Sequence, residues 1–176
     1  PNKPWCWGYY GISFNANLNL EWVKSFPDKD WDYCGISENP NLTLEWLERF
    51  PNKNWCWTNL SNNPNLSLEW LEKFPDKPWD WRFLTDNRNI TMEIIEKYPD
   101  KPWQWEELGI SNNPNITMEF IEKYPDKPWD WHWITRSCNP TIEFIEKYPD
   151  KEWNWRGLSG LKFNKDREWF LLDKYG

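Results

Sequence analysis

Residues 75–98 read PDKPWDWRFLTDNRNITMEIIEKY, and variants of this stretch follow one another along the whole chain. Self-similarity at a fixed period of 24 to 26 residues predicts a stacked-repeat architecture, in which each repeat is stable only against its neighbours. We therefore expect one repeat domain over residues 1–176, with the last repeat acting as a C-terminal cap. The seven repeats, numbered 1 to 7, are residues 1–26, 27–50, 51–74, 75–98, 99–124, 125–148 and 149–176.

The second half of each repeat has the pattern of a short amphipathic helix. In repeat 5, Thr117 is placed to cap this helix with its hydroxyl, and the proline after Tyr124 ends it. The apolar residues have the three- and four-residue spacing of one helical stripe, which consists of Met118, Phe120, Ile121 and Tyr124. On the exposed side, a glutamate followed four residues later by Lys or Arg can form an ion pair that stabilises the helix. The same pattern predicts a two-turn helix in the other repeats, with caps at Thr43, Ser67, Thr91 and Thr141 and with the pairs Glu45/Arg49, Glu69/Lys73, Glu93/Lys97, Glu119/Lys123 and Glu143/Lys147.

The first half of each repeat predicts a shorter helix, either α or 3₁₀. In repeat 5 it covers Pro102 to Leu108, because proline is tolerated in a first helical turn and Asp100 can cap the segment. Asn113-Pro114-Asn115 then ends it. The predicted fold class is all-α: a superhelical α-solenoid of about seven repeats, each with a short α- or 3₁₀-helix followed by a two-turn α-helix.

Paired asparagines on either side of a loop position predict how neighbouring repeats meet. Their side-chain amides can bond the backbone of the adjacent turn, so we expect stacked loops at Asn39/Asn41, Asn63/Asn65, Asn87/Asn89 and Asn113/Asn115. Repeats 1 and 5 carry two extra residues in the same place, at Gly8-Tyr9-Tyr10-Gly11 and Glu106-Glu107-Leu108-Gly109, which predicts a longer or bulged loop. One helix position changes from Trp to Ile or Phe along the chain, which indicates exchange of core volume: Trp22, Trp46, Trp70, Ile94, Phe120 and Phe144.

The composition predicts a folded, acidic protein. The chain has 18 Trp, 9 Phe and 7 Tyr, whereas disordered chains are poor in aromatic residues. The formal net charge of −7 and the absence of a Lys/Arg run disfavour binding to nucleic acid and to an anionic membrane surface. No apolar run approaches the roughly 18 residues of a membrane span, and no signal-peptide pattern is present. The chain starts on a repeat boundary at Pro1 without Met, so we expect residues to be missing upstream.

The four cysteines do not predict a disulfide framework. Cys6 and Cys56 share a repeat position two repeats apart, which is roughly 20 Å and too far for a disulfide. Cys34 and Cys138 occupy other positions, and with His132 as the one histidine a zinc site is not expected. We predict free, partly buried thiols in a reducing compartment.

These motifs resemble those of two known families. The stretch Ile110-Ser111-Asn112-Asn113-Pro114-Asn115-Ile116-Thr117 resembles the leucine-rich repeat variant family, whose 24-residue repeats pair an α-helix with a 3₁₀-helix in a right-handed superhelix. The segments at 75–81 and 125–131, Pro-Asp-Lys-Pro-Trp-Asp-Trp, depart from that family and resemble the tryptophan-rich tandem repeats of giant DNA viruses over nearly the whole chain. The second resemblance implies a viral origin but no activity. Together with the cysteines, it implies an intracellular, reducing location, in a host cytoplasm or a virion.

The sequence lacks the residues of a catalytic or metal site. No nucleophile, base and orienting group stand in a recognisable set, so we predict no enzymatic activity and no cofactor. Asp28-x-Asp30-x-Asp32 resembles the start of a calcium loop, but Tyr33 and Asn39 stand where that loop needs Gly and Glu, so no metal site is predicted. We interpret His132 as a helix-surface or aromatic-packed residue. A structural role is also expected for the serines that recur in phase, Ser13, Ser37, Ser61, Ser111 and Ser159.

The paired aromatic residues leave two interpretations open. On a helix, the second aromatic residue of each pair would share the core face with the Leu/Ile that follows it, and the first would point about 200° away. The first could pack between repeats or under the Phe/Tyr of the preceding helix, or it could form an exposed ridge for Pro-rich peptides, Arg/Lys side chains or sugar rings. The first residues are Trp5, Trp31, Trp55, Trp79, Trp103, Trp129 and Trp153. The second are Trp7, Tyr33, Trp57, Trp81, Trp105, Trp131 and Trp155.

These features predict a non-enzymatic repeat protein that acts as a protein–protein interaction scaffold, with another protein as its partner. Self-association through the N-terminal end is a further expectation, and nucleic acid and membranes are not expected partners. The alternatives are a tryptophan-mediated module for a glycan or Pro-rich peptide, and a structural component of a virion or filament.

Overall fold

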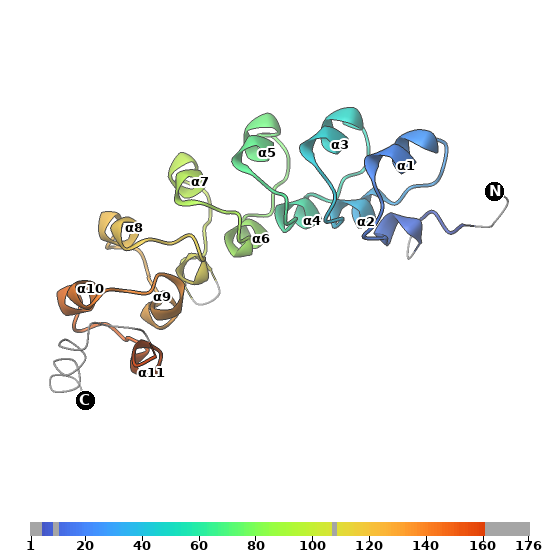
Figure 1. Ribbon diagram of the computed structural model, residues 1–176. Helices are drawn as coiled ribbons and strands as arrows, with labels where there is room; N and C mark the ends of the chain where they lie inside the picture. The colour runs from blue at the N-terminus through green and yellow to red at the C-terminus, as the bar shows by residue number, and fades with distance from the viewer. Residues whose placement is uncertain (1–4, 9–10, 107–108, 161–176) are drawn as a thin grey trace. The chain divides into compact units, whose positions relative to one another are not determined.

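The protein is a helical repeat array of the solenoid type. A computed structural model describes residues 5–8, 11–106 and 109–160, and over these ranges it contains helices and turns but no strand. Short helices recur at the period of the sequence repeat, and within each half of the chain they alternate between two rows (Figure 1). The predicted all-α solenoid class is therefore confirmed. None of the described helices is long and apolar enough to cross a membrane.

The chain divides into two compact halves, Pro1–Ile90 and Thr91–Gly176, which are described separately. A division of this kind is expected in an array where each repeat contacts only its neighbours, so the prediction of a single domain stays a prediction. The N-terminal half contains η1 (Ile12–Phe14), α1 (Leu20–Ser25), α2 (Tyr33–Ser37), α3 (Leu44–Arg49), α4 (Trp57–Ser61), α5 (Leu68–Lys73) and α6 (Trp81–Asp86). The C-terminal half contains α7 (Met92–Lys97), η2 (Ile110–Asn112), α8 (Met118–Lys123), α9 (Trp131–Ser137), α10 (Ile142–Lys147) and α11 (Trp155–Leu158).

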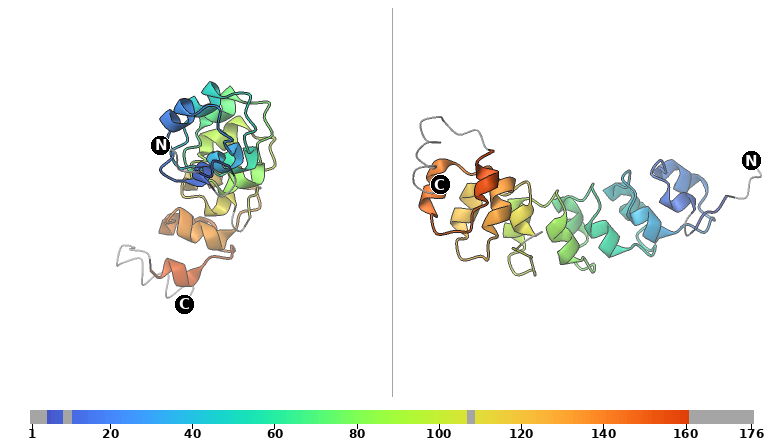
Figure 2. Two further views of the ribbon diagram at one scale, coloured as in Figure 1. Left: turned by 90° about the vertical axis from the view of Figure 1, so that its right-hand side faces the viewer. Right: turned by 90° about the horizontal axis from the view of Figure 1, so that it is seen from below.

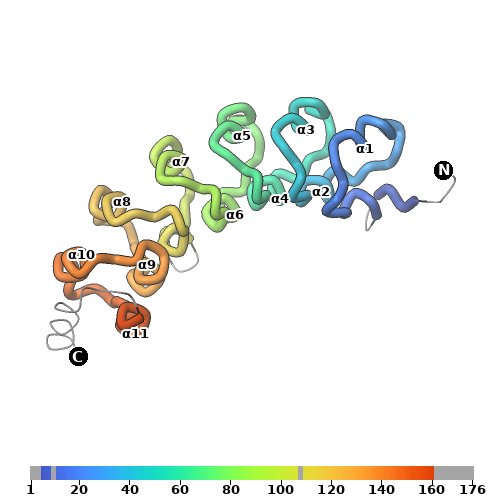
Figure 3. The backbone as a smooth tube through the Cα atoms, viewed as in Figure 1, coloured from blue at the N-terminus to red at the C-terminus, as the bar shows by residue number. Residues whose placement is uncertain are grey.

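Within each half, one row consists of the helices from the second half of each repeat and the other of those from the first half. In the N-terminal half, α1, α3 and α5 form the first row, and η1, α2, α4 and α6 stack in sequence in the second (Figure 3). In the C-terminal half, α9 packs against both η2 and α11 in the same way. Figure 2 shows the helices and the loops between them from two further sides.

The second-half helices form where the sequence predicts them, one residue shorter. Each has six residues, and the aromatic residue before the next proline, such as Tyr124, is the C-cap. The predicted Ser and Thr residues are the N-caps, and Thr91, Thr117 and Thr141 accept a backbone N–H with their hydroxyls. Thr43 and Ser67 occupy the same position without a side-chain capping bond.

The first-half helices begin later than predicted. They start at the second aromatic residue of the pair, and the residue between the two aromatics is the N-cap, as Asp80 is for α6. Asp80 Oδ1 accepts the backbone N–H of Arg82 at 3.1 Å, which satisfies a free amide of the first turn. The Asp-Lys-Pro segment instead forms a turn before the helix, because a residue before proline disfavours the α conformation. The predicted caps before the proline, such as Asp100, are therefore wrong.

The inserted residues of repeats 1 and 5 convert the first-half helix into a three-residue 3₁₀-helix. Residues 102–106, predicted as helical, are not helical, and η2 begins only at Ile110. Ile110 N–H donates to Gln104 O at 2.7 Å, and Gly109 is required because a Cβ would collide with that carbonyl. Ile12 and Cys6 make the same bond in repeat 1. Residues 9, 10, 107 and 108 lie outside the described residues, and so does the predicted cap helix beyond residue 160.

Two aliphatic positions per repeat form the centre of the array. One lies in the first-half helix and the other in the loop before the second-half helix, and both are almost fully buried, as Leu60 and Leu66 show in repeat 3. The second-half helices add two or three more buried residues each, such as Trp70 and Leu71 in α5. The predicted exchange of Trp for Ile or Phe at the Trp70 position is confirmed for repeats 2 to 6, where these residues are buried, but not for repeat 1, where Trp22 is exposed.

Polar side chains join successive repeats at two recurring positions. Asn63 donates its Nδ2 to Ser37 O and Asn39 O in the preceding repeat, at 2.9 and 3.2 Å, while Asn65 Nδ2 donates to Leu42 O. Ser61 Oγ donates to Trp57 O within its own repeat and accepts the backbone N–H of Asp80 in the next. Both the stacked asparagine loops and the structural role of the in-phase serines are therefore confirmed.

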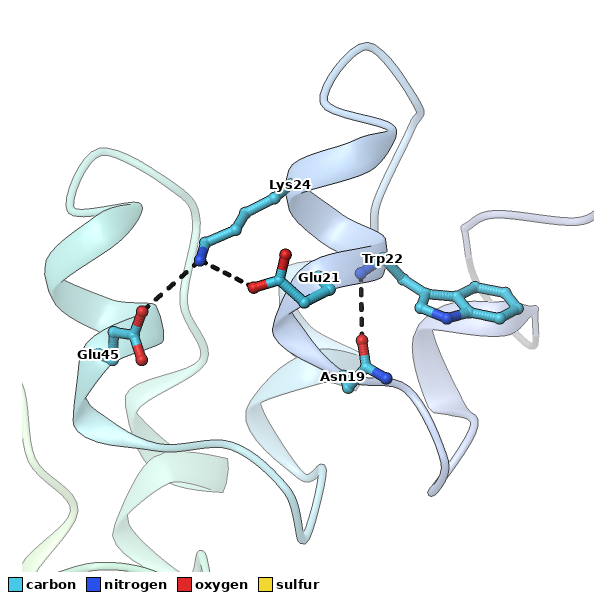
Figure 4. Close-up of polar contacts among 5 residues, drawn as sticks. All are labelled: Asn19, Glu21, Trp22, Lys24 and Glu45. Carbon is cyan, nitrogen blue, oxygen red and sulfur yellow. Dashed lines mark hydrogen bonds and ion pairs between the residues drawn. The ribbon is translucent and has the colours of Figure 1, made fainter.

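The lysines at the ends of the second-half helices pair between helices. Lys123 Nζ lies 2.7 Å from Glu96 and Lys147 Nζ lies 2.8 Å from Glu122, each on the preceding helix of the same row. Lys24 lies 3.0 Å from Glu21 on its own helix and 3.7 Å from Glu45 on α3 (Figure 4). The predicted partner of Lys123, Glu119, is therefore wrong, because the stacking of repeats brings a glutamate of the neighbouring helix to the ammonium.

Candidate interaction surface

The first tryptophan of each pair lies inside the array in six of the seven repeats. Trp31, Trp55, Trp79, Trp103, Trp129 and Trp153 are 5–7% exposed. Each indole N–H donates to the carbonyl of the Phe or Tyr that ends the preceding helix, as Trp55 does to Phe50 O at 2.9 Å. The exposed-ridge interpretation is therefore wrong for these six residues, and packing between repeats is confirmed.

The second aromatic residue of each pair forms the other side of this contact. Trp57 meets Trp79 of the next repeat edge to face, with ring centroids 4.9 Å apart, and Lys77 Nζ lies 5.6 Å from the centre of the Trp57 ring. The first aromatics of repeats 2 to 7 are buried, as in the packing interpretation, whereas the second aromatics, expected on the core face, are mostly half-buried. The reason is that the first tryptophan precedes the helix in a non-helical segment, so helical phase does not determine its direction.

Repeat 1 presents the same contact surface to solvent. Trp5, the seventh member of the predicted ridge, is 53% exposed, and Trp22 is 44% exposed. Their counterparts in repeat 2, Trp31 and Trp46, are 7% and 2% exposed. We call this surface the leading face. It surrounds a cavity of about 120 Å³ lined by Trp5, Ile12, Asn15, Asn17, Leu18 and Trp22.

The orientation of α1 places the Trp22 side chain on the leading face. Asn19 caps α1 by accepting the Trp22 backbone N–H on Oδ1 at 3.2 Å. Figure 4 shows the Trp22 indole projecting from α1 on the side away from Glu45 and α3. The helix therefore turns its charged residues toward α3 and its tryptophan toward the cavity.

Two amide donors lie beside these aromatic rings. Asn39 Nδ2 donates to Asn15 O at 2.9 Å and Asn41 Nδ2 to Ala16 O at 2.7 Å, so each asparagine pair normally binds main-chain carbonyls of the repeat before it. Asn15 and Asn17 occupy these positions in repeat 1, and their Nδ2 groups have no acceptor among the described residues. The leading face thus combines apolar surface with two exposed side-chain amides for which the described residues provide no acceptor.

The other residues singled out by the sequence do not form a site. His132 is exposed on α9, where Nε2 lies 3.2 Å from Asn154 Nδ2 and the ring is edge-on to Trp133, as interpreted from the sequence. The described residues contain no group of three or more His, Cys, Asp or Glu side chains that could hold a metal ion. None of the four cysteines forms a disulfide.

The sequence did not reveal the leading face. Trp22 has the same repeat position as the buried Trp46 and Trp70, so the pattern assigned it to the core.

Comparisons with protein families, with curated proteins and with solved structures yield no match.

Proposed function

We propose that this chain is a non-enzymatic repeat protein that acts as a protein–protein interaction scaffold, and that the leading face is its docking surface. The observation that carries the proposal is the exposure of Trp5 and Trp22 around a cavity, at positions that are buried in the following repeats. Exposed apolar surface with a polar rim is typical of protein interaction sites, and tryptophan is enriched among the residues that dominate binding energy.

The chemistry of the partner follows from what covers the equivalent surface inside the array. Trp31 is covered by the ring of Trp7, and Asn39 and Asn41 bind main-chain carbonyls of an Asn-x-Asn loop. A partner for the leading face must therefore present an aromatic ring and two neighbouring main-chain carbonyls. A repeat of this same type has both groups in the required register, and we assign such a repeat, on another polypeptide or elsewhere in a longer chain, as the partner.

A structural role in a filament or virion is the second candidate. It is favoured by the same observation, because a partner that is a second copy of this chain would bind head to tail. Such a contact joins two different surfaces and continues without closing unless a rotation brings the ends together.

Site-specific photo-crosslinking tests both candidates. We would replace Trp22 with p-benzoylphenylalanine in the full chain, and place the same group at Phe83, which is 41% exposed on α6, as the matched control. The crosslinked peptides are then identified by mass spectrometry, for the purified protein and for a lysate of its natural source.

Crosslinks from position 22, but not from position 83, to a peptide containing the Trp-x-Trp or Asn-Pro-Asn segment of a repeat support the docking surface. The same chain as the source favours the filament, and a different protein with such repeats favours the scaffold. Replacing Asn15 and Asn17 together with Ala should reduce the crosslinking several-fold, whereas Asn52→Ala, an exposed residue away from the face, should not. No crosslink at position 22, or crosslinks to unrelated peptides, would refute the assignment.

A further inference from the structure

Cys34 and Cys56 occupy positions of successive repeats whose side chains face each other. Cys34 is the eighth residue of repeat 2 and Cys56 the sixth residue of repeat 3. The same two positions in repeats 6 and 7 are held by His132 and Asn154, whose side chains are in contact at 3.2 Å. Both pairs join the second residue of one first-half helix to the N-cap of the next.

The surroundings of the two cysteines show the same juxtaposition. Asn59, in the first turn of α4, donates its Nδ2 to Cys34 O at 3.2 Å and lies 3.6 Å from Cys34 Sγ. Cys56 caps that helix and is held against repeat 2 by its backbone N–H, which donates to Ser37 Oγ at 3.0 Å. The Cys34 thiol therefore lies at the end of α4 that Cys56 begins.

We propose that Cys34 and Cys56 are a redox-active pair that forms a reversible disulfide between repeats 2 and 3 by exchange with a small disulfide of the glutathione class. Cys34 is exposed and Cys56 is half-buried, so a small reagent can reach the pair. The geometry of a disulfide requires Cβ atoms about 3.5–4.5 Å apart, a separation suited to residues whose side chains touch.

The exchange balances without any other oxidant. One protein thiol loses its proton and attacks a sulfur of the small disulfide, which breaks the S–S bond and releases one small thiol. The second protein thiol then loses its proton and attacks the mixed disulfide, which forms the protein S–S bond and releases a second small thiol. Two protein thiols are oxidised and one small disulfide is reduced.

The electrostatics of Cys34 determine the rate and the direction of this exchange. Desolvation, and after it the neighbouring Cys56 thiol, raise the pKa of Cys34 to about 11. The exchange should therefore accelerate as the pH rises, because the thiolate is the attacking species. A thiolate that the protein does not stabilise also makes the pair a weak oxidant, so the disulfide persists once it has formed.

The consequence is a covalent clamp between two repeats that otherwise meet through side-chain packing and hydrogen bonds. Closing the loop 34–56 restricts the unfolded chain, and the melting temperature of the N-terminal half should rise by roughly 10 °C on oxidation. The proposed cysteine pair lies between repeats 2 and 3 and is detected as a disulfide, whereas the docking surface lies on repeat 1 and is detected by crosslinking.

Mass spectrometry of the full chain tests the proposal. After incubation with oxidised and reduced glutathione at several ratios, we expect a product lighter by two hydrogen atoms and a linked peptide pair containing Cys34 and Cys56. Cys34→Ser and Cys56→Ser should each abolish this product and the rise in melting temperature. Cys138→Ser, the matched control, should retain both.

Three outcomes would contradict the proposal: glutathione retained on Cys34 or Cys56 as the final product, a disulfide between two chains, or a linked pair that includes Cys6 or Cys138. The helical content of each Cys→Ser variant is measured by circular dichroism. A folding defect is therefore distinguishable from loss of the disulfide in a folded variant.

Discussion

Two small polar residues, a serine and an asparagine in repeats 2 and 3, hold the neighbouring repeats in register. Ser61 is fully buried, and its hydroxyl both accepts the Asp80 N–H and donates to Trp57 O. Thr85 fills the same position in repeat 4 and bonds Trp81 O in the same way, so the hydroxyl rather than the residue type is required. Asn63 satisfies three backbone groups, since it also accepts the Asn65 N–H on Oδ1 at 2.9 Å. A buried polar group costs stability unless it is bonded, and these bonds span two repeats.

Replacing Asn63 with Ala should lower the free energy of unfolding by about 2–3 kcal/mol, because it leaves two buried carbonyls and one N–H without partners. Urea unfolding followed by circular dichroism measures the change. Asn52→Ala, at an exposed position, should stay within about 0.5 kcal/mol of the parent. A loss below about 1 kcal/mol for Asn63→Ala would show that water replaces the amide.

Cys138 should make stability depend on pH in the alkaline range. Burial raises the pKa of this thiol to about 11, from an ordinary value near 9. The unfolded chain therefore loses its proton first, and stability present below pH 9 falls as the pH rises toward 11, by about 2 kcal/mol. Cys138→Ala should reduce this fall. Alkylation of Cys138, followed by mass spectrometry, should reach half its maximal rate near pH 11, and a midpoint near pH 9 would contradict the assignment.

The stability of both kinds of helix in a repeat depends more on the capping of their ends than on their length. Helices of five or six residues are too short to be stable alone, so capping and packing decide where they begin. The first-half helices begin after Asp32, Asp80 or Asp130, whose carboxylates accept the amides of the first turn. Where two residues are inserted, as before Ile110, only a three-residue 3₁₀-helix forms in the described part of the segment.

The N-caps of the second-half helices allow a direct comparison of two threonines. Thr117 Oγ1 accepts the Phe120 N–H at 3.1 Å, whereas Thr43 makes no side-chain capping bond. Thr117→Ala should therefore cost about 1 kcal/mol and Thr43→Ala only a few tenths. Chemical denaturation of the two variants provides the test. Equal losses would show that the threonine backbone preference, rather than the hydroxyl bond, stabilises the cap.

At the scale of the molecule, within each half every repeat is bonded mainly to the repeats before and after it. The edge-to-face contact of the two aromatics, the serine hydroxyl and the asparagine pair all connect residues about one period apart. The free energy of unfolding of such an array is approximately the sum of the intrinsic stability of each repeat and the interaction free energy of each pair of neighbouring repeats. The number of repeats can therefore change while the register must not.

Deleting residues 51–74 should leave a folded protein, because Ser37 would then face Asp80 as it now faces Cys56. The melting temperature should fall by about 5–10 °C with the loss of one repeat and one interface. The control removes residues 51–62, half a repeat, and should abolish helical signal from the flanking repeats. Circular dichroism with thermal melting distinguishes the two. Similar melts for both deletions would refute the dependence on register.

The sequence could not predict the burial of the paired aromatic residues or the proximity of the two cysteines. The pattern identified the right aromatic residues but left the burial of the first one open and placed the second on the core face, whereas Trp79 is buried and Trp81 is half-buried. Helical phase was applied to a residue that precedes the helix, and the true start depended on the Asp80 cap. The proximity of Cys34 and Cys56 was also hidden, because the two cysteines occupy different repeat positions and face each other only through the stacking of α2 and α4.

The amino-acid sequence by itself determined the repeat period, the helical class, the position of the second-half helices and the use of asparagines between repeats. These follow from periodicity, capping and proline placement, which act over a few residues. Only the tertiary structure decided which tryptophans are buried, which lysine pairs with which glutamate, and that Trp5 and Trp22 line an open face. Those properties depend on what the neighbouring repeat covers, and that contact joins residues about 24 positions apart which no local rule relates.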